Sequence, residues 1–252
     1  MNPRPTVITG NWKMNKTIAE ARSFISGLAL VMSQSKFQVG LAVPYTLLAS
    51  AVETANKTSI MIGAQNVSNQ DQGAYTGEIS CGMIKDVGAT FSLVGHSERR
   101  HLFHENDKVV NEKILNCLKW NIQPIFCIGE TLEEHQSGKA YEVLSRQIEQ
   151  GLKGITQTQV ETLVIAYEPV WAIGTNQAAT PDVVQETHVF CREIVAKEWG
   201  KKAADHVVIQ YGGSVTSANA AALLEQNDVD GLLVGGASLT LDSFSKIVLA
   251  RI

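Results

Sequence analysis

Short apolar runs alternate with longer amphipathic stretches along the whole of this chain. The runs read as continuous apolar segments and do not alternate, which indicates a parallel sheet that is covered on its outer face. The spacing between successive runs is mostly about 20 to 40 residues, as expected for repeated strand–helix units. Eight runs are strand candidates: Thr6–Trp12, Val39–Val43, Ile60–Ala64, Phe91–Gly95, Ile122–Ile128, Leu163–Tyr167, Val207–Tyr211 and Gly231–Val234.

The stretches between the runs predict helices. Thr17–Val31, Tyr141–Leu152 and Pro181–Trp199 carry apolar residues at helical spacing, and Thr180 before Pro181 is a favourable helix start. Eight such repeats in about 250 residues favour a closed (β/α)8 barrel. An open doubly wound sheet is the alternative, but no Gly-x-Gly-x-x-Gly follows the first strand. No linker-like or low-complexity segment divides the chain, so residues 1–252 are predicted to form a single domain.

Composition narrows the class of protein. The chain has 252 residues, of which 44% are hydrophobic and 18% charged, as in ordinary soluble globular proteins. A net charge of −4 gives no overall basic field for nucleic acid or an anionic membrane. No apolar run approaches the roughly 18 residues of a membrane span, and the N-terminus does not resemble a signal peptide. The four cysteines have no C-x-x-C spacing, which favours reduced thiols and a cytoplasmic location.

The most informative segment follows the sixth strand candidate. The strand ends on Glu168, Pro169 breaks it, and the next loop is apolar at Val170, Trp171 and Ile173. Loops usually face water, so an apolar loop needs something to cover. We interpret it as a lid that closes over Glu168 and excludes water, which would disfavour the charged carboxylate and suit a general base. A buried turn with an ion-paired glutamate is the alternative interpretation.

Two other strand ends carry candidate chemistry. Asn11 and Lys13 are two residues apart, so they share a face if the strand extends that far, and the lysine would attract an anion. His96 follows the fourth strand at the start of a predicted helix, whose positive dipole end disfavours the protonated ring. A neutral imidazole could donate a hydrogen bond and polarise a carbonyl group. A solvated lysine is the alternative for Lys13.

Further charged residues follow His96. His101 and His104 prompt the question of a metal site, but neither H-x-x-x-H nor H-E-x-x-H occurs. We predict that both histidines lie on a helix surface. Glu98, Arg99 and Arg100 are predicted to form ion pairs.

Paired glycines follow the last two strand candidates. Gly212-Gly213 precedes Ser214, and Gly235-Gly236 follows the eighth strand. Glycine lets backbone N–H groups approach an anion closely, and barrels commonly bind phosphate after strands 7 and 8. One such pair would indicate only a tight turn, but two predict a phosphate site. The long polar loop 65–78 is either a mobile surface loop or a segment that docks on a partner subunit.

Together these motifs resemble those of the triosephosphate isomerase family, over essentially the whole chain. The resemblance implies a homodimeric (β/α)8 TIM barrel that interconverts dihydroxyacetone phosphate and D-glyceraldehyde 3-phosphate in glycolysis and gluconeogenesis. It also implies a cytoplasmic enzyme with no cofactor and no metal. The matching segments are Gly10–Asn15, Val94–Arg99, Ala166–Thr175, Tyr211–Ser214 and Gly235-Gly236.

The resemblance also implies roles for single residues. Glu168 would move the proton, His96 and Asn11 would polarise the carbonyl oxygens, and Lys13 would supply positive charge. The substrate phosphate would rest on backbone N–H groups, and three further residues would support the site. The phosphate-binding residues would be Gly174, Ser214, Gly235 and Gly236, and the supporting residues would be Glu98, Cys127 and Thr76.

By the same resemblance, Thr76 in loop 65–78 would enter the other subunit near Asn11 and His96. One departure concerns the lid: the family more often has Gly-Lys where this chain has Asn176-Gln177, so closing rates could differ. Another phosphate-binding barrel, such as a sugar-phosphate epimerase or isomerase, would share the glycine loops but does not predict the apolar lid. A non-catalytic barrel has no support, because every candidate position carries the expected residue.

Overall fold

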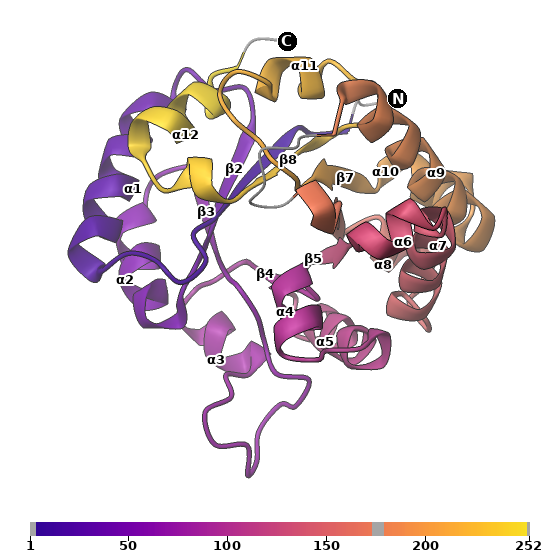
Figure 1. Cartoon of the computed structure of the whole chain (residues 1–252). Helices are drawn as coiled ribbons and strands as arrows, with labels where there is room; N and C mark the ends of the chain where they lie inside the picture. Colours follow the sequence, from indigo (N-terminus) through magenta and orange to yellow (C-terminus); the bar gives the residue numbers. More distant parts are fainter. Residues whose placement is uncertain (1–3, 173–178, 251–252) are drawn as a thin grey trace.

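Eight parallel strands close into a barrel in the computed structural model, which describes residues 4–172 and 179–250 (Figure 1). Each strand pairs with the next one along the chain, and β8 returns to pair with β1. The closed (β/α)8 fold predicted from the apolar runs is therefore confirmed. The strands are β1 (Val7–Asn11), β2 (Gln38–Val43), β3 (Ile60–Ala64), β4 (Phe91–Val94), β5 (Gln123–Ile128), β6 (Val164–Tyr167), β7 (Val208–Tyr211) and β8 (Gly231–Val234).

Helices surround the barrel and cover its outer face (Figure 1). Their starts follow local rules: Thr17 and Glu20 form a capping box at α1, and Thr180 caps α9 with Pro181 in its first turn. The helices are α1 (Ile18–Met32), α2 (Tyr45–Ala55), α3 (Cys81–Asp86), α4 (Ser97–Leu102), α5 (Asp107–Lys119), α6 (Leu132–Gln136), α7 (Ala140–Gly151), α8 (Gln157–Val160), α9 (Pro181–Trp199), α10 (Lys201–His206), α11 (Ala220–Leu224) and α12 (Leu241–Val248), with short 3-10 turns η1 (Val170–Ala172) and η2 (Gly236–Ser238).

Side chains fill the inside of the barrel, so the barrel is a core and not a channel. Successive residues of a strand point to opposite faces, and Ile125 and Cys127 belong to a cluster separate from that of Phe126 and Ile128. Phe91 lies so close to β3 that a Cβ on Gly63 would approach its ring to 2.4 Å. The inner cluster consists of Val7, Ala42, Phe91, Leu93, Ile125, Cys127, Val164, Ala166, Val208 and Leu233.

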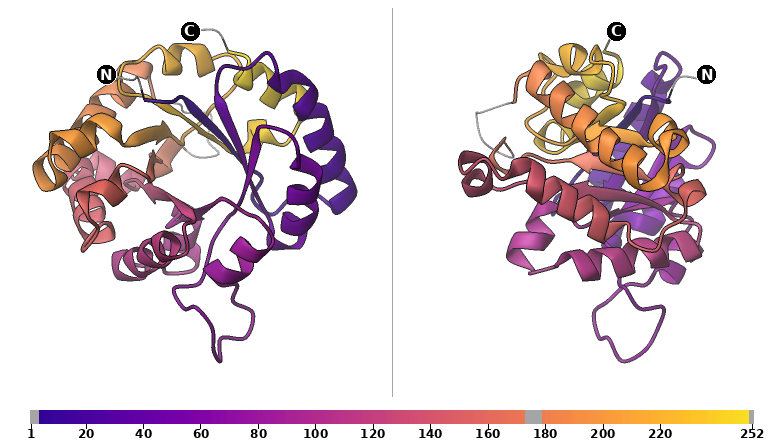
Figure 2. Two further views of the ribbon diagram at one scale, coloured as in Figure 1. Left: turned by 180° about the vertical axis from the view of Figure 1, so that it is seen from behind. Right: turned by 90° about the vertical axis from the view of Figure 1, so that its right-hand side faces the viewer.

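Residues 65–78, hereafter the arm, project from the barrel between β3 and α3 (Figures 1 and 2). A hydrogen bond from the Ser68 N–H to the Ile79 carbonyl, 2.8 Å, closes the base of the arm. Residues 72–78 are exposed, including Thr76. Docking of the arm on a partner subunit stays a prediction.

The element bounds differ from the predictions by only one or two residues. Helix α9 has the predicted ends, whereas β1 ends at Asn11 and not at Trp12. His101 lies in α4 and is exposed, while His104 is exposed just beyond that helix, with a φ of +57°. Over residues 4–172 and 179–250, no helix has the length and apolar character needed to cross a membrane.

Candidate active site

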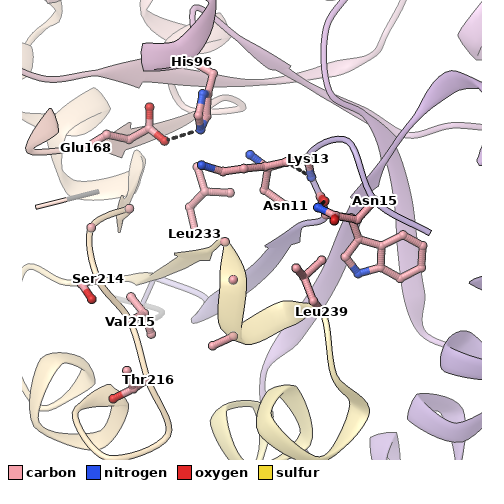
Figure 3. Close-up of a pocket in the computed structure, with 16 residues that line it drawn as sticks. Asn11, Lys13, Asn15, His96, Glu168, Ser214, Val215, Thr216, Leu233 and Leu239 are labelled. Carbon is pink, nitrogen blue, oxygen red and sulfur yellow. Dashed lines mark hydrogen bonds and ion pairs between the residues drawn. The ribbon is translucent and has the colours of Figure 1, made fainter. Parts of the chain in front are cut away.

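The carboxyl ends of the strands surround a pocket of about 420 Å³ (Figure 3). Parallel strands of a barrel all end at one mouth, so residues far apart in sequence meet there. Of the predicted site residues, the pocket is lined by Asn11, Lys13, His96, Glu168, Ser214, Gly235 and Gly236, alongside Trp12, Asn15, Gly212, Gly213, Val215, Thr216, Leu233, Ala237 and Leu239.

Glu168 is the first residue after β6 and is only 2% exposed. Its carboxylate faces His96, with Oε1 3.0 Å from the ring nitrogen Nε2 (Figure 3). Its other oxygen, Oε2, accepts a hydrogen bond of 3.1 Å from the Ser97 N–H. The backbone of Glu168 is tied to β5 by a 2.7 Å bond from its N–H to the Ile128 carbonyl. The carboxylate is therefore buried, hydrogen-bonded and adjacent to a pocket.

Two glycines make room for Glu168, because they carry no side chain. A Cβ on Gly129 would lie 1.8 Å from the Glu168 carbonyl oxygen, and one on Gly212 would lie 2.8 Å from its Cγ. Neither position can carry a side chain unless Glu168 moves. Sequence reasoning placed Gly212 in the phosphate loop and missed Gly129. A glycine directly after β5 was the only local signal, and it resembled an ordinary turn.

His96 is the N-cap of α4, and its Nδ1 accepts a hydrogen bond of 3.2 Å from the Glu98 N–H. This network assigns the ring proton to Nε2, the nitrogen that faces Glu168. Burial lowers the pKa of His96, but the Glu168 carboxylate, through its charge and hydrogen bond, and Glu98 together raise it, so the net pKa lies above the usual value. The direction is opposite to that expected from the helix dipole alone, because the sequence could not show the Glu168 carboxylate 3.0 Å away.

Asn11 and Lys13 meet the pocket through a turn and not through strand alternation. The strand ends at Asn11, and Lys13 adopts a left-handed φ of +51°. That conformation costs a lysine roughly 1–2 kcal/mol. It is held by the Asn11 side chain, whose Oδ1 accepts from the Lys13 N–H at 3.0 Å, and by Gln65, which donates to the Lys13 carbonyl at 2.9 Å. The sequence predicted a shared face only if the strand extended to Lys13, and β1 does not extend that far.

The Lys13 ammonium lies 2.5 Å from Oε1 of Glu98. Both side chains are partly exposed, at 30% and 43%, so solvent screens this pair. Glu98 thus holds Lys13 at the pocket rim. The ion pairs predicted for the two following arginines are confirmed: Arg99 binds Glu105 at 2.5 Å and Arg100 binds Asp107 at 2.7 Å.

The two glycine loops both line the pocket: one starts beside Glu168 at Gly212 and leads to Ser214, and the other, Gly235-Gly236, lies beside Lys13 (Figure 3). Gly236 begins the 3-10 turn η2, and a Cβ there would meet nothing within 4 Å. A Cβ on Gly235 would meet only Cε of Lys13, at 3.6 Å. Open space beside the backbone is the geometry that an anion needs to reach N–H groups. Gly174, the fourth predicted phosphate ligand, lies outside the described residues.

The start of the predicted lid is anchored by a residue that sequence reasoning missed. Trp171 Nε1 donates a 2.7 Å hydrogen bond to Oε1 of Glu130, and the Tyr167 hydroxyl donates to the same oxygen at 3.2 Å. Glu130 is fully buried, and the His135 ring lies 4.6 Å from the Trp171 ring. Ile173, Asn176 and Gln177 lie outside the described residues.

The remaining supporting residues lie in different places. Cys127 is buried inside the barrel, where burial and then the nearby Glu168 carboxylate raise its pKa well above the usual value. It is therefore a protonated thiol at neutral pH. Thr76 lies exposed in the arm and does not contribute to the pocket of its own chain.

A closed barrel whose mouth brings together a buried carboxylate, an imidazole, a lysine and two glycine loops defines a class of barrel enzymes. These enzymes move protons on an anionic substrate. The family model described as triosephosphate isomerase matches residues 6–251 of the chain. The chain belongs to the triosephosphate isomerase family.

Individual relatives agree with the family model. The chain is 48% identical to the triosephosphate isomerase of Protochlamydia amoebophila over 245 residues, covering 97% of this chain and 93% of that one. It is 46% identical to the Fusobacterium nucleatum enzyme of the same name over 248 residues, covering 98% and 99%. It is also 46% identical to that of Carboxydothermus hydrogenoformans over 246 residues, covering 97% and 98%.

Proposed function

We propose that this chain carries out its isomerisation with Glu168 as the single proton-transfer base. The chain interconverts dihydroxyacetone phosphate and D-glyceraldehyde 3-phosphate through an enediolate, a step of glycolysis and gluconeogenesis. The observation that supports Glu168 is its position: the carboxylate is 2% exposed, yet it lines the pocket 3.0 Å from His96. A buried carboxylate beside a substrate pocket is poised to accept a proton.

The reaction needs a base and a way to stabilise negative charge on oxygen. Glu168 removes the proton from the carbon beside the carbonyl and returns it to the neighbouring carbon. The Nε2–H of His96 and the side-chain amide of Asn11 donate to the oxygens as charge develops. Losing one such preorganised donor typically costs about 3–4 kcal/mol of transition-state stabilisation.

His96 must exchange partners during this cycle. Its Nε2–H points at Glu168 in the structure and must turn to the substrate oxygen once Glu168 approaches the substrate carbon. The Glu98 N–H bonded to Nδ1 keeps the ring proton on Nε2 throughout. As the carboxylate takes up the proton, the charge that raises the pKa of His96 disappears, so the ring stays neutral and remains a donor.

The phosphate end of the substrate would bind away from Glu168. Lys13 supplies positive charge, and Ser214, Gly235 and Gly236 line the same pocket, where their N–H groups and that of Gly174 would bind the phosphate. The enediolate can eliminate its phosphate, so water must be excluded while it exists. The apolar lid after Glu168 supplies that cover.

We also propose that the enzyme is a cytoplasmic homodimer, each subunit a single domain. A second pocket of about 480 Å³ lies beside the first and is lined by Lys13, Met14, Glu98 and Phe103 among others. Met14 is 96% exposed and Phe103 is 63% exposed, so this surface is apolar and uncovered in one chain. The arm of a second copy, carrying Thr76, would fill it and support Lys13 from outside.

The proposed function is tested by following isomerisation of dihydroxyacetone phosphate in heavy water. Exchange through Glu168 places deuterium on the product carbon. Glu168→Gln should abolish turnover and keep phosphate-analogue binding, whereas His101→Gln, on the exposed side of α4, should change neither. A Glu168→Gln enzyme with undiminished turnover would refute the assignment. Turnover of a different sugar phosphate, and none of the triose, would refute the substrate.

A further inference from the structure

We propose that Cys81 and Cys117 are a peroxide-reactive dithiol that oxidises to an intramolecular disulfide and fastens the arm to α5. This modification is independent of isomerisation, because neither residue lines the pocket at the mouth.

The two thiols are neighbours across two helices. Cys81 is the first residue of α3, and Cys117 lies near the end of α5. Their sulfurs are 3.8 Å apart and hydrogen-bonded to each other, and both residues are fully buried. A disulfide requires a separation of about 2.0 Å, so the sulfurs need to close by about 1.8 Å. Rotation about the two Cα–Cβ bonds is the motion that would bring the sulfurs together.

Cys81 differs chemically from the other three cysteines. The hydrogen bond with Cys81 and then burial raise the pKa of Cys117 well above its usual value. Cys127 and Cys191 lie apart in the core, and burial raises the pKa of both, that of Cys191 to about 12. The hydrogen bond with Cys117 instead lowers the pKa of Cys81 below its usual value. A thiolate is the nucleophile in thiol oxidation, so Cys81 is the first to react and Cys117 resolves it.

The reaction balances with hydrogen peroxide as the oxidant. The Cys81 thiolate attacks one peroxide oxygen, the O–O bond breaks, and a sulfenic acid and a hydroxide ion form. The hydroxide takes the proton of the Cys117 thiol and becomes water, and the resulting Cys117 thiolate attacks the Cys81 sulfur. The S–S bond forms, the S–O bond breaks, and the second hydroxide takes up the proton that Cys81 gave up on ionising, which yields the second water. Two thiols and one peroxide become one disulfide and two waters.

The position of the two cysteines means that a disulfide between them would restrain the arm. Cys81 follows the arm's exit at Ile79, and α5 already holds the entering half of the arm. Asn116 donates to the Ser68 carbonyl at 3.3 Å, and Trp120 donates to the Asp71 carboxylate at 2.6 Å. A covalent bond from Cys81 to the same helix would fasten both ends of the arm to α5.

Peroxide reaches the pair only when the base of the arm opens. The Trp120 ring lies over Gly82, where a Cβ would meet it at 3.1 Å, and Trp120 is the C-cap of α5, three residues after Cys117. This tryptophan therefore covers the thiols from the protein surface, where it is 36% exposed. Peroxide is about as small as water, so a local opening suffices.

The test is titration of the intact protein with hydrogen peroxide, followed by non-reducing digestion and mass spectrometry. We expect a peptide pair joined through Cys81 and Cys117, two mass units lighter than its reduced parts and reversed by dithiothreitol. It should reach half-conversion while Cys127 and Cys191 remain mostly reduced. Cys191→Ser should still form the link, whereas Cys81→Ser and Cys117→Ser should not.

Hydrogen exchange reports the fastening in the same samples. The Ser68 amide, which closes the base of the arm, should exchange at least threefold more slowly in the oxidised protein than in the reduced one. Three results would overturn the proposal: no linked peptide at any peroxide concentration, a link between subunits instead of within one, or a link that leaves the Ser68 exchange unchanged. The wild-type protein gives all three readouts, so none depends on a variant folding.

Discussion

The two ends of the barrel use charged residues in opposite ways. At the amino ends of β1, β7 and β8, Arg192 donates to Asp228 at 2.7 Å and to Asp230 at 2.6 Å. Its remaining N–H groups bind the carbonyls of Ala204, Val207 and Asp228. Every N–H of this guanidinium has an acceptor, and its charge serves the fold.

At the mouth, by contrast, the charges face open space. Lys13 has three ammonium hydrogens, and among the described residues its Nζ pairs only with Glu98. Glu168 and His96 are buried but line a pocket of about 420 Å³. The comparison teaches that the number of occupied hydrogen bonds distinguishes structural from substrate-binding charges. A charged group whose hydrogen bonds are all made within the protein, here called saturated, stabilises the barrel. A charged group with unused hydrogen-bonding capacity can bind a substrate.

The largest effect should come from removing Arg192 and its hydrogen bonds at the amino ends of the strands. Arg192→Met leaves the buried Asp230 and the half-buried Asp228 with Arg4 as their remaining cation, and should lower the free energy of unfolding by about 3 kcal/mol. Urea unfolding measures it, and turnover per folded molecule should persist. Arg22→Met is the matched control: its pair with Glu53 is exposed, so the loss should stay within about 1 kcal/mol. Equal losses in the two variants would contradict the comparison.

At the mouth, Lys13→Met should impair substrate binding and catalysis together. We expect kcat/KM to fall about 10²- to 10³-fold, because a preorganised positive group is lost from the pocket. Folding should change little, since the pair with Glu98 is partly exposed. Steady-state kinetics measures the difference. Lys108→Met is the control, because the Lys108 side chain on α5 is 85% exposed. Normal kinetics would remove Lys13 from the site.

The saturated end should also respond to pH through His188. This ring is fully buried and accepts no proton readily: burial lowers its pKa to about 4. The unfolded chain takes up the proton near pH 6.5 and the native state only near pH 4, so stability falls as pH drops through that window. The loss should total about 3 kcal/mol.

The measurement for this prediction is urea unfolding at several pH values, for wild type and His188→Gln. Asp228 titrates lower, because its hydrogen bonds to Gln185 and Arg192 outweigh burial and lower its pKa. Between pH 6.5 and 4 the wild-type curve should therefore fall more steeply than that of the variant. Parallel curves would show that His188 is not the group responsible.

The smallest of these effects should come from moving the base without removing it. Glu168→Asp retracts the carboxylate by about 1 Å and should lower turnover about 10²-fold or more, with little change in stability. Glu186→Asp, on the exposed side of α9, provides the matched control. Unchanged turnover in Glu168→Asp would show that proton transfer does not require this carboxylate's placement.

Much of the fold could be predicted because its signals are local. Continuous apolar runs predicted all eight strands, and helical spacing with Thr180-Pro181 predicted α9 to its ends. The sequence did not reveal backbone geometry that depends on contacts with distant residues. The turn at Lys13 depends on bonds from Asn11 and Gln65, and no pattern in residues 10–15 reveals them.

Within the candidate site, the sequence motifs identified the chemical groups but not the hydrogen bonds and ion pairs between them. Glu168 was visible because a proline and an apolar loop follow it. Glu130 gave no such signal, although it holds Trp171, since its partners come from other segments. The 3.8 Å approach of Cys81 to Cys117 was equally hidden, because the two residues are 36 positions apart.

The sequence by itself determined the barrel, the strand ends that carry chemistry and the family to which the chain belongs. Those properties follow from periodicity and from residue types at fixed local positions. Only the tertiary structure decided which charges are saturated, which way the pKa of His96 moves, and which thiols meet. Charges and thiols interact strongly only when they lie within a few ångströms of each other. Those distances are set by folding, because the interacting residues lie far apart in the sequence and no local pattern connects them.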